Sequence, residues 1–68
     1  MNISLKSAEA VTGGELVMAV YVDLIGRVVR RDGEFARVRW DRTQTRKIKP
    51  IESTEALDEI RILGGGAA

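Results

Sequence analysis

A chain of 68 residues with a net charge of +1 has room for one small domain, and its apolar content of 44% favours a globular fold over a disordered chain. It contains no cysteine and no histidine, which excludes disulfides, thiolate zinc sites and cysteine nucleophiles, as well as the usual general base. We therefore expect a binding domain without catalytic activity, metal or cofactor.

The cellular setting is predicted from two further features of the chain. Asp23, Arg27, Arg30 and Arg31 interrupt the longest apolar stretch, so no segment reaches the roughly 20 apolar residues of a membrane span. The first ten residues contain no basic segment followed by an apolar one, as a secretory signal would. We expect a cytoplasmic protein with no membrane partner.

The first third of the chain predicts a weak helix and one strand. Residues 4–11 place Leu5, Ala8 and Val11 on one helical stripe, and Gly13 and Gly14 would end such a helix. A short strand through residues 3–5 is the alternative. Residues 15–23 form an apolar run of strand length that is rich in β-branched side chains.

Two further strands, residues 25–31 and 34–41, flank an Asp32-Gly33 step, which is the strongest short signal of a β-hairpin. A two-residue loop at this step would mix apolar and charged residues on both faces. A three-residue loop, with Gly33 in the left-handed conformation, sorts them instead. It opposes Val28 to Ala36, Gly26 to Val38 and Leu24 to Trp40 on an apolar face, and Val29 to Phe35, Arg27 to Arg37 and Ile25 to Arg39 on the other.

The last third predicts a fourth strand at residues 44–49, which Pro50 ends unless it lies at a sheet edge. Residues 53–55 resemble the start of a helical turn. Residues 59–63 then form either a last strand, which we prefer, or the end of a short helix. One domain is expected over residues 1–63, followed by a flexible Gly/Ala tail at 64–68.

This order of elements predicts a mainly β fold: a small SH3-like antiparallel barrel of four to five strands, with a short N-terminal helical segment and a late helical turn. The segment IGRVVRRDGEFARVRWD resembles the core hairpin of SH3-like, KOW-like and Tudor-like modules, in which a Gly-Val strand leads through a tight turn to a strand ending in Trp-Asp. Such modules recur in transcription and translation factors, so the resemblance implies a binding role in contact with protein or nucleic acid.

The segment TRKIKPIESTEALDEI is similar to the end of the type II dihydrofolate reductases, which are also tiny SH3-like barrels. Ile48 and Pro50 match that family, and residues 56–60 match loosely. The positions of the family's glutamine and tyrosine, however, contain Lys47 and Lys49. The similarity therefore implies shared architecture without the active site.

Charge is distributed unevenly along the chain. Residues 1–26 have a net charge of −2, residues 27–49 of +6 and residues 50–68 of −3. Like charges opposed across two strands are destabilising unless something compensates, and phosphate or carboxylate oxygens match the donor geometry of arginine. The alternative is a solvated face balanced by the chain's own acids. The candidate partner-binding residues are Arg27, Phe35, Arg37, Arg39, Arg42, Arg46, Lys47 and Lys49.

Aromatic residues are too few for a dedicated RNA-binding module, because Trp40 is expected in the core and only Tyr21 and Phe35 remain. We therefore favour a non-catalytic regulatory binding module that docks on an acidic protein surface of transcription-type machinery. A small phage or mobile-element regulator of a host protein such as RNA polymerase would fit this description. The alternative is a nucleic-acid-binding barrel that contacts phosphates directly. Oligomeric state is left open.

Overall fold

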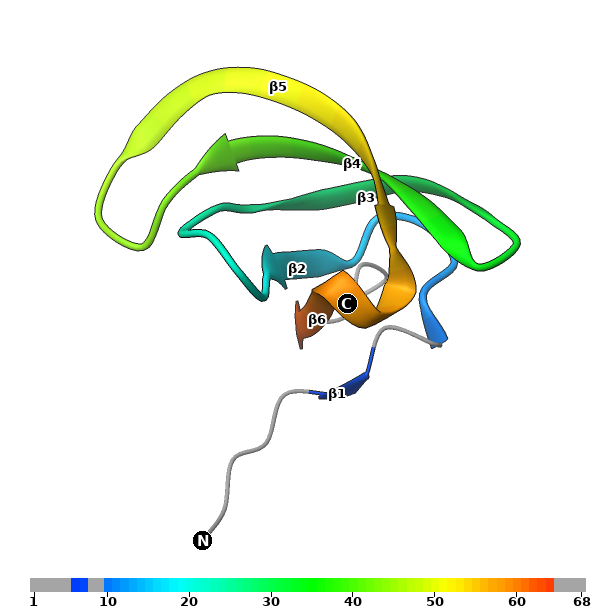
Figure 1. Cartoon of the computed structure of the whole chain (residues 1–68). Helices are drawn as coiled ribbons and strands as arrows, with labels where there is room; N and C mark the ends of the chain where they lie inside the picture. The colour runs from blue at the N-terminus through cyan, green and yellow to red at the C-terminus, as the bar shows by residue number, and fades with distance from the viewer. Residues whose placement is uncertain (1–5, 8–9, 65–68) are drawn as a thin grey trace, which may run out of the picture.

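The computed structural model describes residues 6–7, for which the backbone alone is considered, and residues 10–64. The fold is mainly β with almost no helix (Figure 1). Its elements are β1 (Lys6–Ser7), β2 (Leu16–Ala19), β3 (Ile25–Asp32), β4 (Phe35–Arg42), β5 (Lys47–Ala56), the 3₁₀ turn η2 (Leu57–Glu59) and β6 (Ile60–Gly64).

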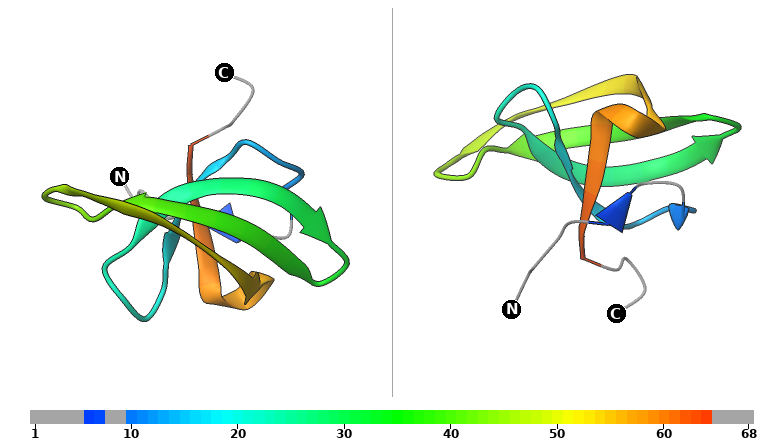
Figure 2. Two further views of the ribbon diagram at one scale, coloured as in Figure 1. Left: turned by 90° about the horizontal axis from the view of Figure 1, so that it is seen from above. Right: turned by 60° about the horizontal axis from the view of Figure 1, so that its bottom comes forward.

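All strands belong to one antiparallel sheet in the order β1-β6-β2-β3-β4-β5. The long strands β3, β4 and β5 arch over β2 and β6 in Figure 1, and the view from above in Figure 2 shows β6 crossing beneath them. Within residues 6–7 and 10–64 no pairing joins β5 to β1, so the sheet is strongly curved but open.

The core fills the concave side of this sheet. Period-two alternation places Val28 of β3 and Ala36, Val38 and Trp40 of β4 on the inner side, where all four are buried. The turn η2 then folds Leu57 beneath them, and Ile60 at the start of β6 is fully buried. The other members of the buried cluster are Val11, Val17 and Ala19.

Trp40 was expected in the core and is only 2% exposed. Its indole Nε1 donates to Ser53 Oγ at 2.8 Å, and the Ser53 hydroxyl donates in turn to Glu55 Oε2 at 2.6 Å. The one polar group of the ring is therefore satisfied by β5, as burial of an indole requires.

The β3–β4 hairpin has the predicted apolar face but a different register. Its loop is the two-residue Gly33-Glu34, so Asp32 opposes Phe35, and an extra residue at Val29 forms a β-bulge between Val28 and Arg30. Gly33 has the expected positive φ, at 65°. Val28 consequently opposes Val38, Arg27 opposes Arg39 and Gly26 opposes Trp40, where the predicted partners were Ala36, Arg37 and Val38.

The predicted boundaries of β2 and β5 were also wrong. β2 ends at Ala19 instead of residue 23, because the chain turns there and the Ala19 N–H donates to the Leu24 carbonyl at 3.0 Å. β5 starts at Lys47 instead of residue 44 and continues to Ala56, so residues 53–55 lie in a strand and the helical turn comes at η2. Pro50 is tolerated inside β5 because this strand is an edge of the sheet.

The two ends of the chain are described only in part. The expected helix at residues 4–11 lies mostly outside the described residues, and Lys6 and Ser7 within it pair with β6 as a strand. The preferred last strand is confirmed as β6, which includes Gly64, and residues 65–68 of the expected tail lie outside the description. No helix in the described part of the chain has the length and apolar character needed to cross a bilayer.

Candidate functional site

The convex side of β3 and β4 carries a group of arginines. Because Ala36, Val38 and Trp40 point inward, the alternating residues Arg37 and Arg39 of β4 point outward. Arg30 of β3 opposes Arg37, and Arg27 opposes Arg39. We call these four residues the arginine face: Arg27, Arg30, Arg37 and Arg39.

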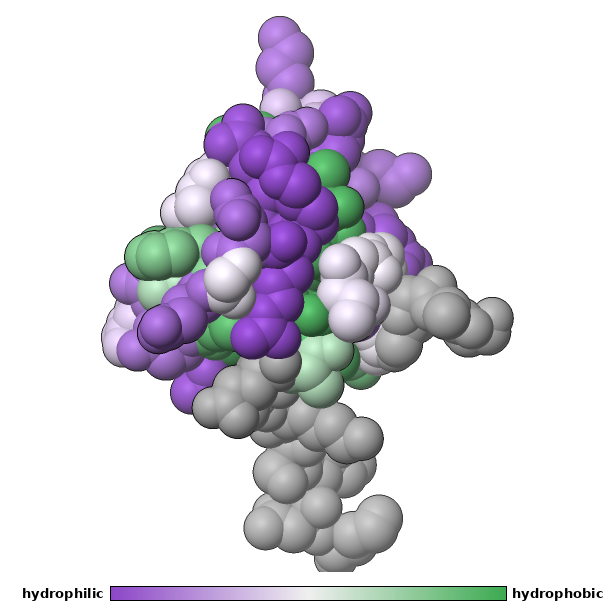
Figure 3. All heavy atoms as spheres, turned by 90° about the vertical axis from the view of Figure 1, so that its right-hand side faces the viewer, coloured by the Kyte–Doolittle hydropathy of each residue, from purple (hydrophilic) through white to green (hydrophobic). Residues whose placement is uncertain are grey.

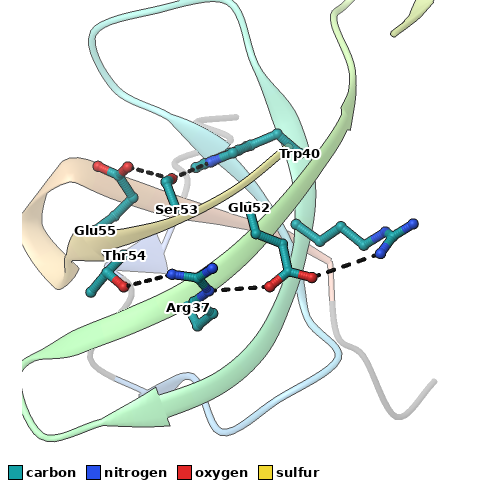
Figure 4. Close-up of polar contacts among 7 residues, drawn as sticks. Arg37, Trp40, Glu52, Ser53, Thr54 and Glu55 are labelled. Atoms are coloured by element: carbon teal, nitrogen blue, oxygen red, sulfur yellow. Dashed lines mark hydrogen bonds and ion pairs between the residues drawn. The ribbon is translucent and has the colours of Figure 1, made fainter. Parts of the chain in front are cut away.

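One carboxylate, from Glu52 of β5, lies against the arginine face. Glu52 opposes Arg39 in the sheet, and its Oε1 lies 3.1 Å from Arg37 Nε while its Oε2 lies 3.7 Å from an Nη of Arg39 (Figure 4). A second Arg37 nitrogen donates to Thr54 Oγ1 at 3.3 Å. The glutamate compensates part of the repulsion between the two arginines, yet both partners of the shorter ion pair have side chains 38% exposed to solvent.

The two arginines of β3 do not contact this carboxylate. Arg27 donates to the carbonyl oxygen of Gly14 at 2.8 Å. Arg30 is exposed, and among the described residues it has no ion pair or hydrogen bond. Among the described residues, the arginine face thus has four guanidinium groups and one carboxylate, which binds two of them, and this leaves an excess of positive charge.

A tight turn before β2 positions the Gly14 carbonyl group that accepts the hydrogen bond from Arg27. The Glu15 carboxylate accepts hydrogen bonds from the Thr12 N–H at 2.9 Å, the Gly13 N–H at 2.8 Å and the Thr12 hydroxyl at 3.1 Å. Partial burial raises the pKa of Glu15, but the hydrogen bonds outweigh it and the pKa is lowered. The charged glutamate thereby fixes the loop that presents the Gly14 carbonyl to Arg27.

Two apolar side chains lie beside the arginines at the hairpin end. Phe35 is 51% exposed and follows the Gly33-Glu34 loop directly, on the same side of β4 as Arg37. Val29, the bulge residue before Arg30, is 47% exposed. Figure 3 views this end of the molecule and shows a strongly hydrophilic stripe with hydrophobic surface on both of its sides.

The remaining predicted site residues lie at the other end of the hairpin, around the β4–β5 turn. Thr43 closes this turn by donating its N–H to the Arg46 carbonyl at 2.7 Å. Arg42 is bound by its neighbour Asp41 at 2.9 Å, and the hydrogen bond from Arg42 lowers the pKa of Asp41. The structure therefore brings Arg27, Phe35, Arg37 and Arg39 together, and places Arg42, Arg46, Lys47 and Lys49 beyond them.

Tyr21, which sequence reasoning could not place, lies in the turn after β2. It is 77% exposed, and the same turn meets the β4–β5 turn through a hydrogen bond from the Gln44 N–H to Asp23 Oδ1 at 3.1 Å. The two exposed aromatic residues, Tyr21 and Phe35, thus lie at opposite ends of β3. They do not form one aromatic surface.

Sequence reasoning missed Arg30 and Glu52 as members of this site. Arg30 was not among the candidate residues, and it joins the site because the bulge at Val29 shifts it opposite Arg37. Glu52 was missed because β5 was expected to end before it. Glu52 and Thr54 are two residues apart, and this spacing could have identified Glu52. If the strand continues past Pro50, both side chains lie on the same side of the sheet as Arg37 and Arg39.

Comparison with known proteins assigns no family or function to this chain. No protein-family model matches the chain, and searches of curated proteins and of solved structures give no match either.

Proposed function

We propose that this chain is a non-catalytic regulatory binding module of the cytoplasm, folded as a small SH3-like barrel, that docks on an acidic protein surface through the arginine face. The observation that carries the proposal is the set of four arginines on adjacent strands with one bound carboxylate, Glu52. Such an excess of like charge is unfavourable in the free molecule and is relieved by an anionic partner.

Two features support the SH3-like assignment. Five strands run in the order β6-β2-β3-β4-β5 with strong curvature, and the 3₁₀ turn η2 comes directly before β6, the last of them in the chain. The β3–β4 hairpin is also the segment whose sequence resembles SH3-like, KOW-like and Tudor-like modules. This resemblance is the reason to propose transcription-type machinery as the partner. The small size of the single domain and the barrel type are the reasons to test RNA polymerase first.

The residues around the arginine face favour a protein partner over a nucleic-acid partner. Trp40 is buried and hydrogen-bonded to Ser53, so its ring has no face for base stacking. The exposed rings of Tyr21 and Phe35 lie at opposite ends of β3. Proteins that bind single strands usually stack successive bases on neighbouring aromatics. Phe35 and Val29 beside the arginines fit instead the mixed apolar and charged character of a protein interface.

The test is an affinity capture from lysate divided into nuclease-treated and untreated halves, with RNA polymerase subunits probed directly. The double substitution Arg37→Ala with Arg39→Ala removes the two β4 residues of the arginine face. Arg46→Ala with Lys47→Ala makes the same charge change at the β4–β5 turn. We expect a protein partner that survives nuclease, is lost with the first pair and is kept with the second. A partner lost on nuclease treatment, or kept without Arg37 and Arg39, would overturn the proposal.

A further inference from the structure

We infer that the partner is recognised through carboxylates at alternate positions of an extended segment, and that Glu52 occupies this site in the free protein as an internal competitor. The inference rests on the proposed function and specifies its ligand. It starts from the position of the Glu52 carboxylate, which has Arg37 on one oxygen and Arg39 on the other.

Glu52 shows which anion the two arginines accept, but it does not saturate them. A guanidinium has five N–H donors, and charge-assisted N–H···O bonds are typically about 2.7–2.9 Å long. The Arg37 contact to Glu52 is 3.1 Å and the Arg39 contact is 3.7 Å, so the second is a loose ion pair. Arg37 has one further contact, to Thr54. Donors therefore remain on both residues for a second carboxylate.

The spacing of the arginines determines how far apart the acidic groups of a matching ligand must be. Arg37 and Arg39 are two residues apart on one strand, which is about 6.8 Å. Arg30 and Arg27 oppose them and complete two rows, each with one arginine from β3 and one from β4. Alternate residues of an extended peptide are separated by the same distance. In a peptide that lies along β4, acids at positions i and i+2 therefore each reach one of the two rows.

Phe35 adds a third position to this pattern. It is the preceding outward residue of β4, so the positions along the strand are apolar, cationic and cationic at steps of two. The bulge residue Val29 is also exposed at this end of the hairpin, and Asp32 opposes Phe35 across the two strands. The complementary segment carries one apolar residue and two acids at alternate positions. The apolar contact favours a peptide over a nucleic-acid backbone with similar phosphate spacing.

A competing role for Glu52 has a consequence that a purely structural role lacks. An incoming carboxylate must share Arg37 and Arg39 with a fixed negative charge, so removing that charge strengthens binding. If Glu52 instead held the two guanidinium groups in the binding geometry, removing its charge would weaken binding. Glu52→Gln separates the two roles, because glutamine has the same length and still accepts a hydrogen bond from Arg37.

The probe is a synthetic peptide in which one leucine and two glutamates alternate with serines, measured by fluorescence anisotropy at low salt. A control peptide has the same composition with the two glutamates adjacent, and an oligothymidylate tests the phosphate alternative. We expect Glu52→Gln to bind the alternating peptide about threefold more tightly than the wild type does, as loss of one partly exposed repulsive charge implies. Asp58→Asn, an equal charge change in η2, should leave the affinity within about twofold.

The outcomes separate the inference from the proposed function. Weaker peptide binding by Glu52→Gln, with binding still lost on Arg37→Ala and Arg39→Ala, would overturn the competitor role and leave the proposed function standing. Equal affinity for both peptides would overturn the alternate spacing. Peptide binding that ignores the two arginine substitutions, or tighter binding of the oligothymidylate than of the peptide, would overturn the proposed function itself.

Discussion

Gly26 of β3 packs against the backbone of Arg39 so closely that no side chain fits between them. A β-carbon at residue 26 would collide with the carbonyl group of Arg39, coming within 2.7 Å of its carbonyl carbon and within 2.7 Å of the Trp40 Cα. This contact draws β3 onto β4 where Arg27 opposes Arg39 and beside the buried Trp40. The glycine therefore helps to set both the core and the arginine face.

Replacing Gly26 with alanine should destabilise the fold by about 2–3 kcal/mol, because backbone atoms have to move to admit the methyl group. Urea unfolding followed by the fluorescence of the single tryptophan measures this loss. Gly64→Ala is the matched control, since an added β-carbon there meets nothing within 4 Å. Equal stability of the two variants would show that β3 and β4 are not in this close contact.

Gly33 in the hairpin loop gives a second prediction, which depends on its backbone conformation and not on the space available to a side chain. Gly33 has a φ of 65°, and an added β-carbon would meet nothing within 4 Å. Gly33→Val should therefore cost more than about 1 kcal/mol through backbone strain alone, whereas Gly33→Asn should cost less because asparagine tolerates this region. Thermal unfolding of both variants measures the difference. A valine variant as stable as the asparagine variant would contradict the positive φ.

The hairpin illustrates what sequence reasoning determined and what it missed. The buried face of Val28, Ala36, Val38 and Trp40 was predicted correctly. Between Gly26 and Val28 the observed register differs from the predicted one by two residues, and a slip of two preserves the face. The partners themselves were wrong. They depend on the bulge at Val29 and on a two-residue loop at Gly33-Glu34 where a three-residue loop over residues 31–33 was expected. Alternation of side chains contains no information on either.

Burial of Trp40 predicts a large loss of stability on truncation. Trp40→Ala should cost about 3–5 kcal/mol, enough to unfold a domain of this size. Trp40→Phe retains most of the packing but loses the hydrogen bond to Ser53, so a smaller cost of about 1–2 kcal/mol is expected. Circular dichroism with urea titration measures both. A folded Trp40→Ala variant defective only in binding would place the ring on a recognition surface instead.

The turn closed by Glu15 gives a prediction for the pH dependence of stability. Its carboxyl pKa is lowered in the folded protein, so the charged form contributes stability above the ordinary value of 4.5, and this contribution is lost as the pH falls through the lower folded pKa. Glu15→Ala should therefore cost about 1 kcal/mol at neutral pH and progressively less below about pH 4. Urea unfolding at pH 7 and pH 3 measures the two costs. A cost that does not fall at pH 3 would show that the ionised carboxylate does not hold the turn.

The arginine face itself was predicted only in outline. Arg27, Arg37 and Arg39 were assigned to one side of the sheet by alternation, and they lie there. Glu52 could not be assigned, because its position against Arg39 follows from β5 running on past Pro50 as an edge strand after an irregular step between Trp40 and Arg42. Pairing across such an irregularity is a property of the assembled sheet, which no single segment encodes.

The central claim, that the arginine face binds an acidic partner, is tested most directly by NMR mapping of amide shifts in the ¹⁵N-labelled chain during titration with the alternating acidic peptide. We expect the largest shifts at the outward residues of the hairpin, namely Arg27, Arg30, Phe35, Arg37 and Arg39. Shifts concentrated at the β4–β5 turn around Arg46 and Lys47, or no saturable shifts anywhere, would contradict it.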